Sequence, residues 1–359
     1  MPTRLGGAIG FGSEVGWMME KQTVFIVGAG ASAEFGLPVG SRLAEQISKT
    51  AKAMQFDGFG RQTGGSRSLV SAVHLSEGNN ELLRVRDDFQ RISSGVLLSP
   101  SIDNYLHAHS ENSARVKIGK LLIAKALFEA ERDSSLFFNP DNIYDRFDFS
   151  KVSNTWLSVL FRTLVTVGDL ESLRGQLRNI TFISFNYDRV IHRFFFLAVQ
   201  TLFDLSESEA EEFCFENLSI YYPYGSLGTL QSRNRDSGFG LQGEASSILA
   251  ASESIKVFTE KGNQATQKKV RQRIVDADTV FFVGFSFLSL NMNYLSPRIQ
   301  SNLRVFGTTY GMSEFNKSIA ENNIAIWINN GQSYKPTFTL PSVTCAQLLS
   351  DLSGFFEQD

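Results

Sequence analysis

The chain has 359 residues, 42% of them hydrophobic and 20% charged, which excludes a wholly disordered protein. Its 34 Lys and Arg against 37 Asp and Glu give a net charge of −3, so a global basic footprint for nucleic acid is absent, although the sequence leaves a local basic patch open. Two cysteines, Cys214 and Cys345, are too few for a four-thiolate zinc site or a disulfide framework. We expect no metal and no direct binding of nucleic acid.

The length predicts about two domains, or one large α/β domain with an insertion. No apolar run approaches the roughly 20 residues of a membrane helix, and the N-terminus lacks the pattern of a signal peptide. We therefore expect a cytoplasmic protein without a membrane partner. The glycine-rich residues 1–18 predict a flexible arm, and a true start at Met18 or Met19 stays open.

Several short runs of apolar, β-branched or aromatic residues recur along the chain. Such runs are typical of strands that are buried on both faces of a parallel sheet. Between the first two strands, helical periodicity dominates. The first elements expected in chain order are a strand at 23–27, a helix from Ser41, a loop at 55–68 and helices from about 79 to 175. Strands at 180–185 and 219–222 follow, on either side of a helix at 190–202. The last strands are expected at 279–283, 304–307 and 324–328, the final one after a helix near 313–322.

This alternation predicts a doubly wound, Rossmann-like parallel sheet with an all-helical insertion. The sheet domain would comprise residues 19–54 and 176–359, and the insertion residues 55–175. In such a fold, ligands bind at the carboxyl ends of the strands. The polar motifs of this chain all follow predicted strands, so we expect them to meet in one site.

The first motif is Gly28-Ala29-Gly30, which follows the first strand and extends through Ser32 to Gly36-Leu37-Pro38. Glycines at such a turn let the backbone approach a phosphate, and the next helix offers free N–H groups to it. A tight turn without a ligand would look similar. The acidic residue that a dinucleotide-binding fold places about twenty residues later is missing, which disfavours an ordinary dehydrogenase.

The second motif is Ser184-Phe185-Asn186-Tyr187-Asp188. An amide at the end of a strand can hold a water molecule and a ribose, and a carboxylate can bind a ribose or a carboxamide. The alternative is a helix N-terminus that Asp188 caps. Two further turns, Tyr224-Gly225-Ser226 and Gly284-Phe285-Ser286, follow later strands.

These motifs resemble those of the sirtuin family, in its bacterial sirtuin-like form, over residues 23–42, 180–192, 219–228 and 278–290. The zinc ribbon of the deacetylases cannot be built from two distant cysteines, which excludes a normal deacetylase. The resemblance implies an NAD⁺ hydrolase that cleaves the nicotinamide–ribose bond in defence against phage. It also implies a homo-oligomer and an operon-encoded ATPase or Argonaute-like partner.

By the same resemblance, Asn186, Asp188 and Tyr224 are the catalytic candidates. Tyr224 stands where the family has a His, and an unperturbed Tyr with a pKa near about 10 is a poor base. His107 or His109 is an alternative proton acceptor, and Asp103, in a stretch that also resembles the family, could reach the ribose or cap a helix. A protein that binds NAD without cleaving it stays open. The resemblance implies these NAD-binding residues: Gly28, Ala29, Gly30, Ser32, Gly36, Pro38, Ser184, Asn186, Asp188, Gly225, Gly284 and Ser286.

Overall fold

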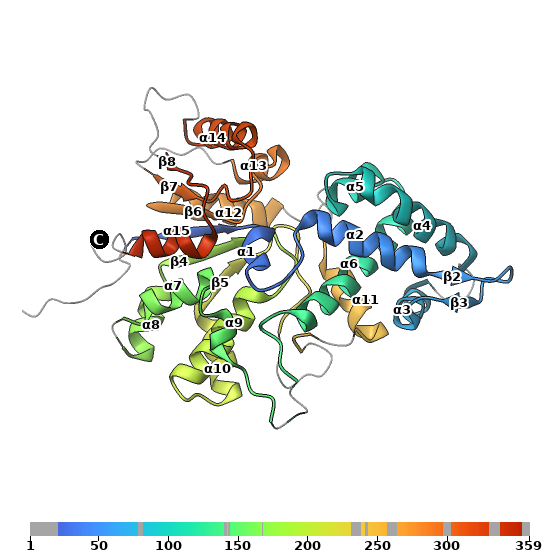
Figure 1. Ribbon diagram of the computed structural model, residues 1–359, viewed down its shortest axis with the longest axis horizontal. Helices are drawn as coiled ribbons and strands as arrows, with labels where there is room; N and C mark the ends of the chain where they lie inside the picture. Colours follow the sequence, from blue (N-terminus) through green and yellow to red (C-terminus); the bar gives the residue numbers. More distant parts are fainter. Residues whose placement is uncertain are drawn as a thin grey trace, which may run out of the picture.

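The structure is a computed structural model of the whole chain (Figure 1). The predicted N-terminal arm, residues 1–18, lies outside the described residues. The structure describes residues 21–77, 82–139, 142, 144–166, 168–230, 238–240, 243–256, 264–296, 303–329 and 338–353.

A six-stranded parallel sheet forms the centre of the fold, in the order β5-β4-β1-β6-β7-β8. Counted along the chain, this order is 3-2-1-4-5-6, as in Rossmann-type sheets. Val27 lies level with Ser184 and Val283, so the turns after β1, β4 and β6 leave the sheet at the same edge. The strands are β1 (Thr23–Val27), β4 (Ile180–Ser184), β5 (Ser219–Tyr221), β6 (Thr279–Val283), β7 (Arg304–Gly307) and β8 (Phe338–Thr339).

Every residue of β1, β4 and β6 is buried, as the uninterrupted apolar runs predict. Alternate side chains enter two different cores, with Val24 in one and Phe25 in the other. Phe25 lies between Phe182 and Phe281 of the neighbouring strands, with ring centroids 5.5 and 4.9 Å apart. The high phenylalanine content of the chain is thus used in part to cover this sheet.

Helices pack on both faces of the sheet (Figure 1). None of the helices in the described part of the chain is both long and apolar enough to cross a bilayer. The helices beside Phe25 are α7 (Trp156–Leu164), α8 (Leu170–Leu177), α9 (Val190–Leu202), α10 (Glu207–Asn217) and α15 (Cys345–Asp351), preceded by the 3₁₀ turn η2 (Phe149–Val152). Those on the opposite face are α12 (Gln264–Val275), α13 (Ser289–Leu295) and α14 (Glu314–Asn329).

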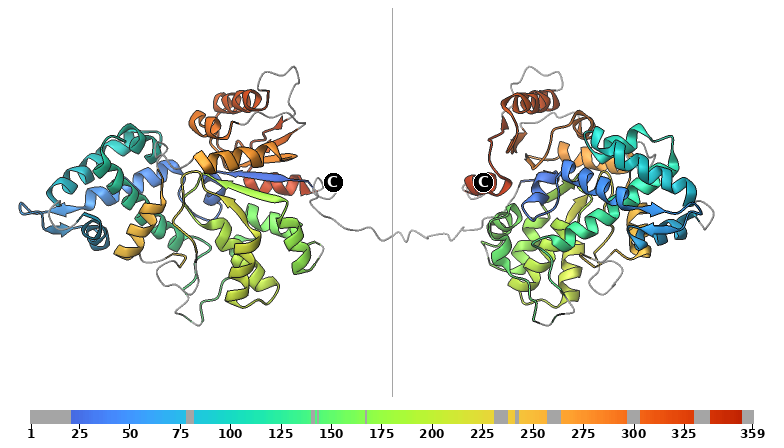
Figure 2. Two further views of the ribbon diagram at one scale, coloured as in Figure 1. Left: turned by 180° about the vertical axis from the view of Figure 1, so that it is seen from behind. Right: turned by 45° about the vertical axis from the view of Figure 1, so that its right-hand side comes forward.

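The remaining helices form a group beside the sheet, called here the helical group (Figure 2). It consists of α2, α3, α4, α5, α6 and α11, together with a short hairpin of β2 and β3. The short helix α1 (Ala29–Ala33) follows β1, and the segment after α1 leads into the helical group at α2. The bounds are α2 (Gly40–Ala53), β2 (Gln55–Phe56), β3 (Gln62–Gly64), α3 (Arg67–Glu77), α4 (Leu82–Gly95), η1 (Val96–Leu98), α5 (Ile102–Ala108), α6 (Ser113–Asp133) and α11 (Ala245–Ser254).

This packing groups the elements differently from the segments expected from the sequence. The range 55–175 contains the β2–β3 hairpin and is therefore not all-helical, and α7 lies against the sheet. Conversely, α2 packs on α4 and α6, and α11 packs on α3 and α6, although both lie outside that range. Periodicity shows that a helix has an apolar face, but it does not say which partner covers that face.

The strand expected at residues 324–328 was wrong, because these residues form the last turns of α14. Ile324, Trp327 and Ile328 are buried and Ile326 is 73% exposed, which is helical spacing rather than strand alternation. β-branched residues favour strands only as a tendency, and burial of one helix face overrides it here. The sixth strand is instead the two-residue β8.

Candidate functional site

The turns that follow β1, β4 and β6 border a cavity of about 690 Å³. It lies at the carboxyl ends of the strands, where the strand order reverses at β1, which is where open α/β sheets bind ligands. Ligand cavities in proteins are commonly about 300–1,000 Å³. The second wall comes from the helical group, through Ser101, Asp103 and Asn104 at the start of α5.

All four predicted turns contribute to this one cavity. The predicted residues that line it are Gly28, Ala29, Gly30, Asn186, Tyr224, Gly284 and Ser286. The predicted residues that are not part of the lining are Ser32, Gly36, Pro38, Ser184, Asp188 and Gly225. Of these, Ser32, Ser184 and Asp188 are buried, and Gly225 lines a second cavity. The alternative proton acceptors, His107 and His109, do not line the cavity of about 690 Å³ either.

The turns after β1 and β6 touch through their backbones. The N–H of Gly28 donates to the oxygen of Val283, and the N–H of Gly30 donates to that of Gly284, both at 3.0 Å. A Cβ atom on Gly28 would lie 2.5 Å from the oxygen of Gly284, and Gly284 itself has a φ of +58°. The close approach of the two turns therefore requires both glycines, whether or not a phosphate binds.

Asn186 is held in one orientation at the end of β4. Its Nδ2 donates to the backbone oxygen of Gly28 and to Oγ of Ser32, each at 2.9 Å. Both protons of Nδ2 are used in these bonds, so Oδ1 is the atom with which this side chain can accept a hydrogen bond from a ligand.

Asp188 lies behind Asn186 and supports it through Ser32. The Ser32 hydroxyl, which accepts from Asn186, also hydrogen-bonds the Asp188 carboxyl, and the N–H of Val190 donates to that carboxyl at 3.1 Å. Burial raises the pKa of Asp188 to about 6, although these two hydrogen bonds lower it. Val190 is the first residue of α9, but the N-cap of that helix is Arg189, so Asp188 precedes the position that the capping alternative expected for it.

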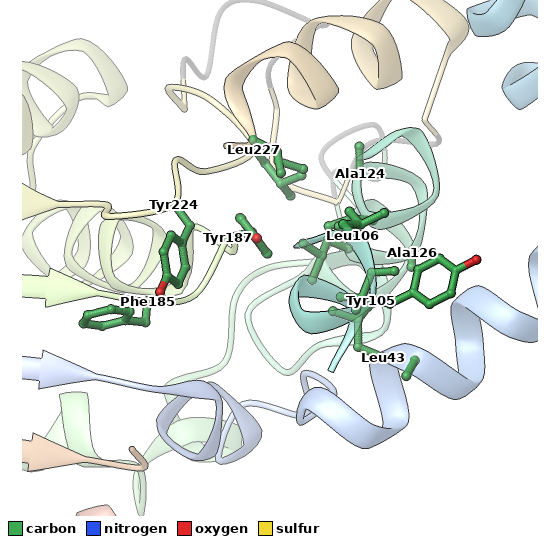
Figure 3. Close-up of a cluster of buried hydrophobic side chains, with 14 of the residues drawn as sticks. Leu43, Tyr105, Leu106, Ala124, Ala126, Phe185, Tyr187, Tyr224 and Leu227 are labelled. Carbon is green, nitrogen blue, oxygen red and sulfur yellow. The ribbon is translucent and has the colours of Figure 1, made fainter. Parts of the chain in front are cut away.

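Tyr224 lines the cavity, but its hydroxyl is already bonded. It donates to Oδ1 of Asn291 at 2.7 Å, and its ring lies edge-on to Phe185, with centroids 5.5 Å apart (Figure 3). Burial and the nearby carboxyl of Asp103 raise the pKa of Tyr224 above its usual range. The hydroxyl thus stays protonated near neutral pH and cannot serve as a base.

Two further carboxyl groups line the cavity. Glu34 was not among the predicted residues, whereas Asp103 was expected to reach a ribose or to cap a helix, and the N-cap of its helix is Ser101. Glu34 accepts from the N–H groups of Trp156 at 2.7 Å and Ala346 at 3.0 Å, and so holds the first turns of α7 and α15. Burial raises its pKa, and these hydrogen bonds oppose the shift. The partners are 122 and 312 residues away, so no local sequence signal could have shown this.

Asp103 is the other carboxyl group, and it accepts a hydrogen bond from the Tyr187 hydroxyl. Figure 3 labels Tyr187, from the turn after β4, and Leu106, from the helical group, as members of one buried cluster. Burial raises the pKa of Asp103, and the bond from Tyr187 acts in the opposite direction. The pairing joins the two walls of the cavity.

The N-terminus of α2 also reaches the cavity, through Val39 and Gly40. Val39 occupies the N-cap position without a side-chain hydrogen bond, which leaves N–H groups of the first turn available to another acceptor. The positive end of this 14-residue helix favours an anion. Among the described residues, no three His, Cys, Asp or Glu side chains are grouped as metal ligands.

Comparison with protein-family models, with curated proteins and with solved structures found no match to this chain.

Proposed function

We propose that the protein is a sirtuin-like NAD⁺ hydrolase that cleaves the nicotinamide–ribose bond. In this proposal the parallel sheet is a doubly wound dinucleotide-binding sheet, and most of the helical group is an insertion into it. The observation that supports the proposal best is that four turns, at Gly28–Gly30, Asn186, Tyr224 and Gly284–Ser286, border a single cavity of about 690 Å³.

The proposal assigns one end of the cavity to the diphosphate of the dinucleotide. The turn at Gly28–Gly30 and the uncapped start of α2 at Gly40 are its partners, because backbone N–H groups and a helix N-terminus both favour anions.

Asn186 is the proposed partner of the ribose next to the bond that breaks. Its Oδ1 accepts a hydrogen bond from a ribose hydroxyl or from the attacking water, and its fixed Nδ2 limits the loss of side-chain freedom on binding. Asp188 then acts as a positioning residue through Ser32, rather than as a direct partner of the nicotinamide, because it does not line the cavity.

A binding protein that does not cleave NAD⁺ is the second candidate. It is favoured by Tyr224, whose hydroxyl is protonated and donates to Asn291, since the family's catalytic His is replaced there by a group that cannot accept a proton. The proposed biology is the same for both candidates: a homo-oligomer in the cytoplasm that works with an operon-encoded ATPase or Argonaute-like partner in defence against phage.

The test is release of free nicotinamide from NAD⁺, measured with the purified full chain alone and with its operon partner. We expect release by the wild type, loss of release in Asn186→Ala, and wild-type release in Asn316→Ala, a matched change of an exposed Asn on α14. Saturable binding of NAD⁺ without release under either condition would establish the second candidate instead.

A further inference from the structure

Asp103 is the acid in the first turn of α5, but it does not occupy the N-cap position of that helix. The N-cap of α5 is Ser101, whose Oγ accepts from the N–H of Asn104 at 3.2 Å. Asp103 lies in the first turn behind this cap and lines the cavity. Its carboxyl accepts from its own backbone N–H, while Ser101 supplies the cap.

The other two carboxyls near the cavity, Glu34 and Asp188, have structural partners. Glu34 uses both oxygens to accept backbone N–H groups of α7 and α15, and Asp188 is bonded to Ser32 and Val190 behind the lining. Asp103 accepts from the Tyr187 hydroxyl and from its own backbone N–H, two donors for a group with about four lone-pair sites. Unlike Asp188 it lines the cavity, and unlike Glu34 it does not hold two helices in place, so it has capacity left for a water molecule or a ligand.

The surroundings of Asp103 suit a carboxylate that takes up a proton. The hydroxyls of Tyr187 and Tyr224 both interact with its carboxyl, and α2 and α6 pack against α5, the helix that carries it. Burial raises the pKa of Asp103. A carboxylate so placed is a better proton acceptor than an exposed one.

We propose that Asp103 is the catalytic proton acceptor of this site, and that Tyr187 is the residue that positions it. This inference rests on the proposed hydrolase. Water attacks C1′ of the ribose as the bond from C1′ to the pyridinium nitrogen breaks. The electron pair of that bond goes to the nitrogen and leaves neutral nicotinamide, and the proton of the water passes to the Asp103 carboxylate and then to solvent. The products are ADP-ribose, nicotinamide and one proton.

The direct test is Asp103→Asn in the full chain, with kcat and KM for NAD⁺ measured from about pH 4 to 8. We expect kcat to fall about 10²–10⁴-fold while KM stays near that of the wild type. The wild-type rate should fall as the pH drops through the raised pKa of Asp103, and this acidic limb should be missing from Asp103→Asn. Asp87→Asn, an exposed acid on α4, is the matched control and should leave the profile unchanged.

Tyr187→Phe gives a second readout that does not depend on removing the acid. The Tyr187 hydroxyl lowers the pKa of Asp103, so its loss should move the acidic limb to higher pH. A purely structural role of Tyr187 would lower stability without moving that limb. If Asp103→Asn does not fold, the direction of this shift decides the question.

The outcomes separate this inference from the proposed function. If the wild type releases nicotinamide and Asp103→Asn releases it equally fast, the hydrolase stands and Asp103 is not its base. If the wild type never releases nicotinamide, with or without its partner, both the hydrolase and its proton acceptor are wrong.

Discussion

Substitution of Gly284 by Ala tests the contact that forms one border of the cavity. Gly284 follows β6 at a φ of +58°, a left-handed conformation that an L-residue adopts only at a cost. Its added Cβ would lie 2.0 Å from the backbone nitrogen of Ala31 and 2.4 Å from the carbonyl carbon of Gly30. Both are backbone atoms, so no side chain can rotate away and the two turns must separate.

The expected loss is the sum of two terms. The left-handed conformation costs an Ala about 1–2 kcal/mol, and overpacking of a close contact costs about 1–3 kcal/mol. We therefore expect Gly284→Ala to lower the free energy of unfolding by about 2–5 kcal/mol, out of a typical total of 5–15 kcal/mol.

Equilibrium unfolding in urea, followed by tryptophan fluorescence, measures this loss. Trp156 is a suitable probe, because its Nε1 donates to the oxygen of Ala31 at 3.1 Å, next to the affected turn. Gly175→Ala is the control: Gly175 lies inside α8 with no atom within 4 Å of an added Cβ, and should gain about 0.5–1 kcal/mol. Equal urea midpoints for Gly284→Ala and the wild type would refute the described packing of the two turns.

Two further predictions concern buried charges. Glu131 is fully buried, and its Oε1 accepts from Nε of Arg189 at 2.9 Å. Glu131→Gln should therefore lower the free energy of unfolding, measured in urea, by about 3–5 kcal/mol. Glu129→Gln on the same helix removes an exposed carboxylate that pairs with Lys125, and it should cost below about 1 kcal/mol. Equal losses in the two variants would contradict this reasoning. For Asp188, the folded-state pKa of about 6 lies above the unfolded value, so the folded protein holds a proton that the unfolded chain has released. The free energy of unfolding should therefore fall by up to about 3 kcal/mol as the pH rises from about 4 to 6. Unfolding curves for Asp188→Asn should lack this fall. Parallel pH profiles of the two proteins would show that Asp188 is not buried as described.

Local patterns predicted much of the sheet. The runs at 23–27 and 279–283 are strands with these same bounds, and the helix expected at 190–202 is α9. These segments could be predicted because a strand that is buried on both faces is apolar throughout. An amphipathic helix places apolar residues at a helical period, which is also visible in the sequence. The rule that ligands bind at the carboxyl ends of strands then indicated where the turns would meet.

The parts that failed depend on partners far away in the sequence. Whether Ile324 and Trp327 belong to a strand or a helix was decided by the core that covers them. The position of Asp188 behind Ser32, and the pairing of Asp103 with Tyr187 across 84 residues, follow from tertiary packing alone. A motif gives the residue types at a turn, but not which side chains face the ligand.

A crystal structure of the full chain grown with ADP-ribose would test the central claim most directly, since this molecule is the product expected from NAD⁺. The account predicts density for ADP-ribose inside the cavity, with its diphosphate at the turn of Gly28–Gly30 and a ribose hydroxyl on Oδ1 of Asn186. Density for ADP-ribose at another surface, with this cavity filled only by water, would contradict it.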